Sequence, residues 1–161
     1  FYNGPANFSE AQSFCKNEGG DLASILSQDE QNAIVDLQQF NQNSYIGLTR
    51  KISGFGDFAW PNGQIVPPPN PPNYYNWSMG EPNNSSELGE PEDCVEIYPG
   101  TVLPRGTWND VRCSARLPFI CEFQLASIIQ YNIDDRNFYL INGNRTRNWT
   151  EANLYCENNY P

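Results

Sequence analysis

Five side chains with the chemistry of a ligand site stand close together between residues 81 and 110. Three are carboxylates and two are carboxamides: Glu81, Asn83, Glu92, Asn109 and Asp110. Their oxygens are hard donors of the kind that Ca²⁺ takes. The same groups accept and donate hydrogen bonds, as recognition of two neighbouring sugar hydroxyls requires. The pattern therefore indicates a site for a calcium ion, for a sugar, or for both.

Cysteines and glycosylation sequons indicate an oxidising setting. The five cysteines show no C-x-x-C spacing, and because their number is odd, one must remain free or pair outside this chain: Cys15, Cys94, Cys113, Cys121 and Cys156. Six Asn-x-Ser/Thr sequons are present: Asn7, Asn76, Asn83, Asn84, Asn144 and Asn148. Together they favour a glycoprotein that is secreted or lies on the extracellular face of the cell surface.

The composition excludes several classes of function. The 161 residues carry 9 Lys and Arg against 19 Asp and Glu, and the net charge of -10 argues against nucleic-acid binding. There is no His, which removes the commonest general base and the usual zinc ligand. No apolar run approaches the roughly 18 residues of a membrane span, so we expect no direct membrane insertion. Without an initiator Met or a signal peptide, Phe1 is expected to follow an internal cut in a longer protein.

An internal repeat predicts the domain boundaries. Residues 8–15 and 149–156 both read as an aromatic residue, a hydroxyl residue, Glu-Ala, a second aromatic residue and Cys. We expect residues 1–124 to form one domain, and residues 125–161 to be a linker followed by the truncated start of a second such domain. Cys156 would then pair within the remainder of that second domain. The alternative is a chance similarity between two amphipathic helices.

Helix and strand signals predict an α+β domain. A capping box at Ser9 and Gln12 starts a first helix, which ends before Gly19. A second helix starts at Ser27, with Glu30 as its capping partner. Short strands are expected at residues 45–48, 93–98, 106–111 and 118–123.

Residues 61–91 are dense in Pro, Asn and Gly and predict a long loop. Its Pro-rich run at residues 67–72 is stiff and cannot join the centre of a sheet. Trp60 and Trp77 flank the run, so an ordered loop with a flexible tip is favoured over a disordered linker. We assign these tryptophans and Trp108 to the core rather than to a sugar platform.

Several motifs, in this order, make residues 1–124 resemble a C-type lectin-like domain. The motifs are the helix ending at Cys15, Gly19–Ser24, Tyr45–Leu48, Tyr75–Trp77, Glu81–Asn84, Glu92–Cys94, Trp108–Asp110 and Phe119–Glu122. The resemblance implies an α+β, C-type lectin-like fold with two helices, antiparallel strands and a long ligand-binding loop, closed at its base by its two ends. It also implies two disulfides, Cys15–Cys121 and Cys94–Cys113.

The resemblance assigns one calcium site to this chain. Its ligands carry over to the side chains of Glu81, Asn83, Glu92, Asn109 and Asp110, each of which can supply an oxygen. It also implies a cis bond before Pro82, which would turn Glu81 and Asn83 toward one ion. We expect weak calcium binding, with a Kd on the order of 10⁻⁴–10⁻³ M.

The resemblance also implies Ca²⁺-dependent carbohydrate binding. Two sugar hydroxyls would coordinate the ion, each donating to a carboxylate and accepting from a carboxamide. In the family, the Glu-Pro-Asn order goes with mannose, fucose, glucose and N-acetylglucosamine, so the expected partners are glycans or glycoproteins that end in such sugars. The alternative is a lectin-like domain that binds a protein or another non-sugar ligand, or is purely structural. An enzyme is not expected, because a bound calcium ion would keep Glu81 and Glu92 ionised and no His could activate a serine.

Two departures from the family pattern affect the site. An auxiliary calcium ion, which some members hold, is predicted to be absent or weak because Lys51 and Phe55 stand where acids are needed and Asn84 is neutral. Asn83 is both a calcium ligand and a sequon asparagine, and a glycan on it would block coordination. Asn84 is therefore the more plausible acceptor of the two.

Overall fold

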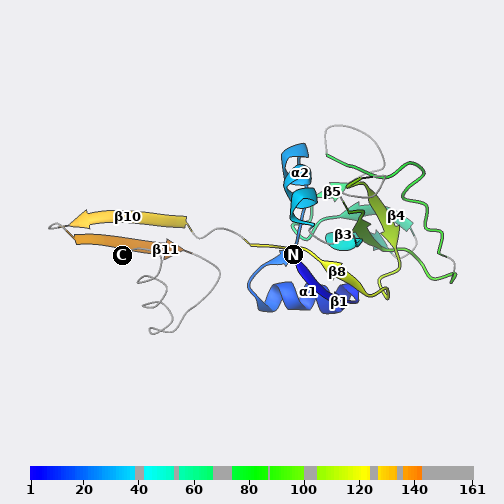
Figure 1. Cartoon of the computed structure of the whole chain (residues 1–161), viewed down its shortest axis with the longest axis horizontal. Helices are drawn as coiled ribbons and strands as arrows, with labels where there is room; N and C mark the ends of the chain where they lie inside the picture. The colour runs from blue at the N-terminus through cyan, green and yellow to red at the C-terminus, as the bar shows by residue number, and fades with distance from the viewer. Residues whose placement is uncertain are drawn as a thin grey trace. The chain divides into compact units, whose positions relative to one another are not determined.

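The structure is a computed structural model that describes residues 1–38, 42–52, 55–66, 74–86, 88–99, 105–123, 127–133 and 136–142. The chain divides into two compact units, Phe1–Glu122 and Phe123–Pro161 (Figure 1). The Pro-rich run at 67–72, the repeat at 149–156 and Cys156 lie outside the described residues. Among the described residues, no helix has the length and the apolar character needed to cross a membrane.

Both expected helices are present in the first unit, although the first cap differs from the prediction. Helix α1 spans Phe8–Asn17, and its capping box consists of Asn7 and Glu10, so the expected pair of Ser9 and Gln12 is wrong. The Asn7 side chain accepts from the Glu10 amide at 3.0 Å, and the Glu10 carboxylate accepts from the Asn7 amide at 3.2 Å. A short asparagine side chain with Glu three residues later satisfies two free amides at once.

The second helix begins where the sequence predicts. Helix α2 spans Gln28–Leu37, and Ser27 is its N-cap because its Oγ accepts from the Glu30 amide at 3.2 Å. The Glu30 carboxylate reaches back one residue further than a capping box requires and accepts from the amide of Leu26. Both helices therefore start on side-chain oxygens that satisfy free amides of the first turn.

A seven-stranded sheet forms the body of the first unit. Its strands run in the order β1–β8–β3–β4–β5, with β6 pairing to β3 and β7 pairing to β6. The bounds are β1 Tyr2–Ala6, β3 Ser44–Ile52, β4 Phe55–Ala59, β5 Ile65–Val66, β6 Cys94–Ile97, β7 Trp108–Val111 and β8 Leu117–Phe119. A second, two-stranded sheet pairs β2 (Asp21–Leu22) with β9 (Cys121–Glu122).

The four expected strands are confirmed in β3, β6, β7 and the β8–β9 segment, and the sequence missed two longer ones. Strand β1 contains Gly and Pro, and β4 contains Gly, so neither gives a strand signal. Strand β1 pairs antiparallel with β8, with Tyr2 opposite Phe119. The two ends of the unit therefore close its base, as the resemblance implied.

The core packs around the inner strands of this sheet. Trp108 is 0% exposed and Trp60 is 2% exposed, and their rings meet edge to face, so the assignment of both to the core is confirmed. Trp77 is partly buried and packs against the same cluster. Tyr45 is fully buried, and its hydroxyl donates to the carbonyl of Ala115 at 2.9 Å. The buried residues thus form two clusters, one around Trp60 and Trp108 and a second one that contains Tyr45.

Both disulfides implied by the resemblance are present. Cys15 pairs with Cys121 across 106 residues, and Cys94 pairs with Cys113 across 19 residues. In the chain-entropy account the longer loop contributes about 4–5 kcal/mol to stability and the shorter loop about 3 kcal/mol. The shorter one also ties β6 to the segment that follows β7.

The second unit contains a β-hairpin. Strand β10 (Ser127–Ile133) pairs antiparallel with β11 (Arg136–Asn142), with Ser127 opposite Asn142 and Ile133 opposite Arg136. The sequence predicts a linker in this segment, so the strands are an addition that the structure makes. Its two segments rich in Ile, Tyr and Phe, separated by Asp134 and Asp135 in the sequence, are a strand signal that could have been used.

Candidate functional site

Strands β6 and β7 place three of the five predicted ligand residues. Asn109 and Asp110 lie on β7, where they face Glu96 and Val95 of β6 across the antiparallel ladder. Glu92 lies two residues before β6 and is 9% exposed. The Cys94–Cys113 disulfide joins β6 to the segment that follows β7, so a covalent bond adds to the strand pairing beneath this part of the site.

Asp110 connects that base to the loop that carries the remaining ligands. Its side chain is fully buried. Its Oδ1 accepts from the amide of Asn83 at 2.9 Å, and its Oδ2 accepts from the amide of Asn84 at 2.9 Å. The structure therefore brings residues 83 and 110, which are far apart in the sequence, into direct contact. Hydrogen bonds from backbone amides to a carboxylate hold the loop in one arrangement.

Glu81 precedes a proline in this loop. The Glu81–Pro82 peptide bond is cis, as the resemblance implied. The Oε2 atom of Glu81 is buried and has no hydrogen-bond donor. Burial, followed by the adjacent carboxylate of Asp110 and the charge of Glu92, raises the pKa of Glu81 to about 7. An orphaned carboxylate oxygen against a second carboxylate is an arrangement that a cation would stabilise.

Glu92 and Asn83 hold the next turn of the loop. Glu92 Oε2 accepts from the amide of Ser85 at 3.0 Å, and the Glu92 amide donates to Asn84 Oδ1 at 2.8 Å. Asn83 Oδ1 accepts from the same Ser85 amide at 2.7 Å. Burial raises the pKa of Glu92, and the charge of Asp110 adds to the rise. The two predicted ligands therefore share one amide donor and lie close to each other.

Glu96 orients Asn109 and was missed by sequence reasoning. Asn109 Nδ2 donates to Glu96 Oε1 at 3.1 Å, and Asn43 Nδ2 donates to the same oxygen at 2.9 Å. Glu96 is only 6% exposed, and burial raises its pKa. Because its nitrogen is directed at Glu96, Asn109 keeps its Oδ1 available for another ligand. The two strands expected at residues 93–98 and 106–111 could have indicated it, because their antiparallel pairing places Glu96 directly opposite Asn109.

Arg50 is a second residue that sequence reasoning missed. It lies on β3, and its side chain is 8% exposed. Its Nη2 lies 2.7 Å from Asp110 Oδ2. The sequence draws attention to Lys51 and Phe55 in this segment, whereas the contact that the structure shows with Asp110 is made by Arg50.

The residues present fit a calcium ion in kind. Glu81, Glu92 and Asp110 supply carboxylates, Asn83 and Asn109 supply carboxamides, and oxygen-only sets of this type suit Ca²⁺ rather than zinc. Glu81 Oε2 is the atom with an unmet need for a positive partner. Over the part of the chain that the structure describes, no three acidic or cysteine side chains converge tightly enough to form a metal cluster. The role of the five residues as ligands stays a prediction.

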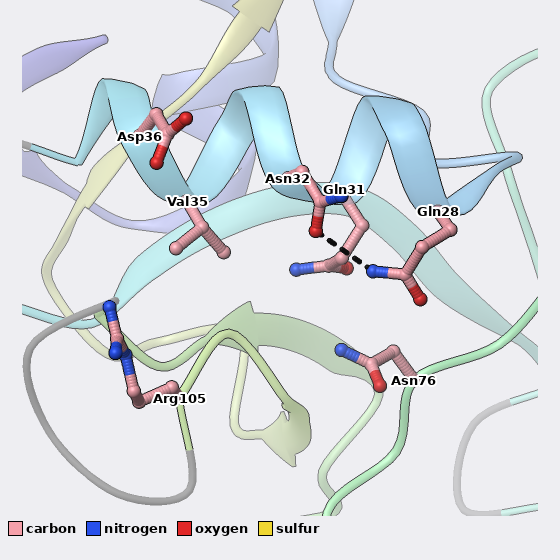
Figure 2. A pocket seen from close by; sticks show the side chains of 7 residues that line it. All are labelled: Gln28, Gln31, Asn32, Val35, Asp36, Asn76 and Arg105. Atoms are coloured by element: carbon pink, nitrogen blue, oxygen red, sulfur yellow. Dashed lines mark hydrogen bonds between the residues drawn. The ribbon is translucent and has the colours of Figure 1, made fainter.

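A separate hollow of about 590 Å³ lies over α2 (Figure 2). Its lining is mostly carboxamide: Gln28, Gln31, Asn32, Val35, Asp36, Asn76 and Arg105. Gln31 is 2% exposed; its side-chain Nε2 donates to the Gly106 carbonyl at 2.7 Å, and its Oε1 accepts from Trp108 Nε1 at 2.9 Å. These bonds fasten α2 to the start of β7, so we assign the buried glutamine a structural role.

Comparison with known proteins finds relatives that are similar to this chain in sequence. Collectin-43 of Bos taurus is 36% identical over 118 residues, which is 73% of this chain and 33% of that protein. Pulmonary surfactant-associated protein D of Sus scrofa is 37% identical over 117 residues, which is 72% of this chain and 28% of that protein. The chain therefore spans about a third of the length of these relatives.

Solved structures share the fold. The carbohydrate-recognition domain of cow CD23, determined with a GlcNAc2Man3 oligosaccharide, is 32% identical with a TM-score of 0.59. The match covers 74% of this chain and 81% of that domain. It confirms the predicted fold class, and because a lectin domain is a binding module, the expectation that the chain is not an enzyme is confirmed as well. Residues 4–123 match the model of the lectin C-type domain, and the chain belongs to that family.

Proposed function

We propose that the first unit binds carbohydrate through a calcium ion held by Glu81, Asn83, Glu92, Asn109 and Asp110. The observation that carries the proposal is the buried Glu81 Oε2, which has no donor and lies beside the Asp110 carboxylate. Two like charges in one partly buried place need a cation or a proton to remain together. When bound, calcium would supply open coordination positions for two sugar hydroxyls.

The chain's own residues would then orient the sugar. Glu81 and Glu92 would accept hydrogen bonds from its hydroxyls, and Asn83 and Asn109 would donate to them. Asn109 Nδ2 has two hydrogens, and Glu96 uses only one of them. Glu96 would therefore fix the direction of the second hydrogen toward the ligand.

The sugar class that we propose is the mannose type: mannose, fucose, glucose and N-acetylglucosamine. Support comes from the order Glu81-Pro82-Asn83, which in the family goes with sugars of this class. The cow CD23 domain, with its GlcNAc2Man3 oligosaccharide, is a relative for which such a ligand is named. The double substitution Glu81→Gln with Asn83→Asp reverses the two roles. It should weaken mannose binding and favour galactose in a competition assay, and unchanged selectivity would contradict the proposed geometry.

The proposed setting is extracellular. Two disulfides suit an oxidising compartment, and the partners would be glycans or glycoproteins with terminal sugars of this class. We also propose that residues 125–161 open a second domain of the same kind, on the evidence of the repeated motif and the separate second unit. Two weak sites in one protein would raise avidity through effective concentration.

Retention on a mannose column tests the main proposal. The chain should be retained in calcium and released by EDTA, and Glu81→Gln should abolish retention because it removes a carboxylate ligand. Glu90→Gln is the matched control, since Glu90 lies in the same loop but is exposed and accepts from Ser114 Oγ at 2.7 Å. Retention that survives EDTA, or an equal loss in both variants, would contradict calcium-dependent binding.

A second candidate is a lectin-like domain that binds a protein or another non-sugar ligand. The observation that favours it is that Asp110 is already satisfied by two amides and Arg50 without any metal ion. A calcium titration by calorimetry separates the two candidates. No heat of calcium binding, with the fold intact, would support this second function.

A further inference from the structure

The guanidinium of Arg50 contacts four oxygen-bearing groups beside the candidate site: the side chains of Asp110 and Asp93 and the carbonyls of Glu92 and Gly56. Its Nη2 lies 2.7 Å from Asp110 Oδ2, and its Nε lies 3.4 Å from Asp93 Oδ1. Nη2 also donates to the Glu92 carbonyl at 3.2 Å, and Nη1 donates to the Gly56 carbonyl at 3.5 Å. The side chain is 8% exposed, so these contacts are made with little competition from water.

Packing fixes the guanidinium in this position. Its Cζ lies 4.4 Å from the ring centre of Phe58, which is 3% exposed and faces Arg50 across the β3–β4 ladder. The Arg50 amide also donates to the Asp93 carbonyl at 2.8 Å. A planar cation on an aromatic face keeps its fork of donors in one plane.

The contacts of Arg50 reach both sides of the ligand loop. Through Asp110, it meets the carboxylate that receives the amides of Asn83 and Asn84. Through the Glu92 carbonyl, it holds the point where the loop returns to β6. One side chain on the sheet therefore connects the outgoing and returning arms of the loop.

Charge makes this connection necessary. Asp110 is 0% exposed, and a buried carboxylate without a positive partner strongly opposes folding of the segment around it. The guanidinium is surrounded by oxygens of two carboxylates and two backbone carbonyls. Oxygens of these two kinds are also the ligands that Ca²⁺ binds in proteins. Arg50 brings a positive charge and a fork of N–H donors to these oxygens.

We propose that Arg50 is a positioning residue that serves as a built-in cation. It holds the loop at residues 81–92 in its ligand-ready arrangement when calcium is absent, and it occupies the place in which a second divalent ion would sit. The inference rests on the calcium site proposed above. Its test is made without calcium, so the two proposals can fail separately.

Amide exchange measured by NMR in EDTA is the test. In the unchanged chain, the amides of Asn83 and Asn84 should exchange slowly, because both donate to the carboxylate that Arg50 holds. In Arg50→Met, which keeps most of the side-chain volume, these two amides should exchange at least about tenfold faster. The amides of Val95 and Ile46 in the sheet core should stay slow in both, which shows that the fold persists.

Three further variants separate the contact geometry from charge and from folding. Arg112→Met removes another positive charge that acts on Glu92, and Arg116→Met removes an exposed arginine that pairs with Glu10. Both should exchange as the unchanged chain does. Arg50→Lys keeps the charge but loses the fork, and it should give intermediate exchange at Asn83 and Asn84.

The outcomes decide the proposal. Equal exchange in Arg50→Met and in the unchanged chain would overturn it, as would fast exchange of the Asn83 and Asn84 amides in the unchanged chain in EDTA. If Arg50→Met fails to fold, Arg50→Lys carries the test, and exchange equal to that of the unchanged chain would overturn the role of the fork. Calorimetry that finds two calcium ions bound to residues 1–122 of the unchanged chain would overturn the inference that Arg50 occupies the place of a second divalent ion.

Discussion

Competition between protons and calcium at Glu81 gives the sharpest prediction for the candidate site. In the calcium-free domain, burial and the neighbouring carboxylates raise the pKa of Glu81 from 4.5 to about 7. A calcium ion can use this oxygen only after the proton leaves. Lowering the pH through 7 should therefore weaken calcium binding at pH values where an ordinary glutamate is fully ionised.

The size of the effect follows from the pKa. For one competing proton, the apparent Kd is multiplied by one plus ten raised to the difference between pKa and pH. Calcium affinity should therefore be about tenfold weaker at pH 6 than at pH 8, and about a hundredfold weaker at pH 5. With an ordinary glutamate pKa, the change down to pH 5 would stay below about twofold. The raised pKa of Glu92 adds to the loss at the acidic end.

Calorimetric titration of calcium in buffers with different ionisation enthalpies measures both the affinity and the proton release. About 0.9 proton should leave for each calcium bound at pH 6, and about 0.1 at pH 8. Glu90→Gln, in the same loop, should show the same slope as the unchanged chain because Glu90 is exposed and bonded to Ser114. A calcium affinity that changes less than twofold between pH 8 and pH 6 would refute the reasoning.

The stability of the calcium-free domain should change in the opposite direction. Because the folded pKa of Glu81 lies above its unfolded value, the folded state binds more protons between pH 4.5 and about 7. The Glu81 contribution to the free energy of unfolding in EDTA is therefore present below pH 4.5 and is lost as the pH rises through 7. Urea denaturation at several pH values in EDTA would show this loss, and Glu81→Gln should remove it.

Two further substitutions test the elements that position the site. Glu96→Leu removes the acceptor that orients the side-chain amide of Asn109, and it should weaken calcium binding about 10- to 100-fold. Glu96→Gln can still accept from Asn109 and should retain most of the affinity. An equal loss of affinity in both variants would contradict an orienting role. Gly47→Ala would place a methyl group 2.6 Å from the Leu22 carbonyl oxygen and should lower the free energy of unfolding by about 1–3 kcal/mol in a urea titration. Gly4→Ala, where a methyl group meets no atom within 4 Å, is the matched control, and similar losses in the two variants would contradict the packing argument.

Local patterns in the sequence were enough for much of the framework. Capping residues and helical periodicity predicted α1 and α2, and short segments with strand signals predicted β3, β6 and β7. They failed where the local signal conflicts with the fold: β1 and β4 contain Gly or Pro and become strands because neighbouring strands supply their hydrogen bonds. The first cap was misplaced by two residues because Ser9 and Asn7 are both good capping residues, and only the backbone geometry selects Asn7.

The sequence by itself determined which residue types are available for a site: three carboxylates and two carboxamides beside a proline and a pair of cysteines. Tertiary structure decided which other side chains contact and orient these five residues. Arg50 contacts Asp110 across 60 residues, and Asn43 reaches Glu96 across 53. Such contacts leave no periodic trace in the sequence, because they depend on the register of β3 with β6 and of β6 with β7. Burial, which turns Asp110 and Glu81 from surface acids into groups that need a positive partner, exists only once those strands have packed.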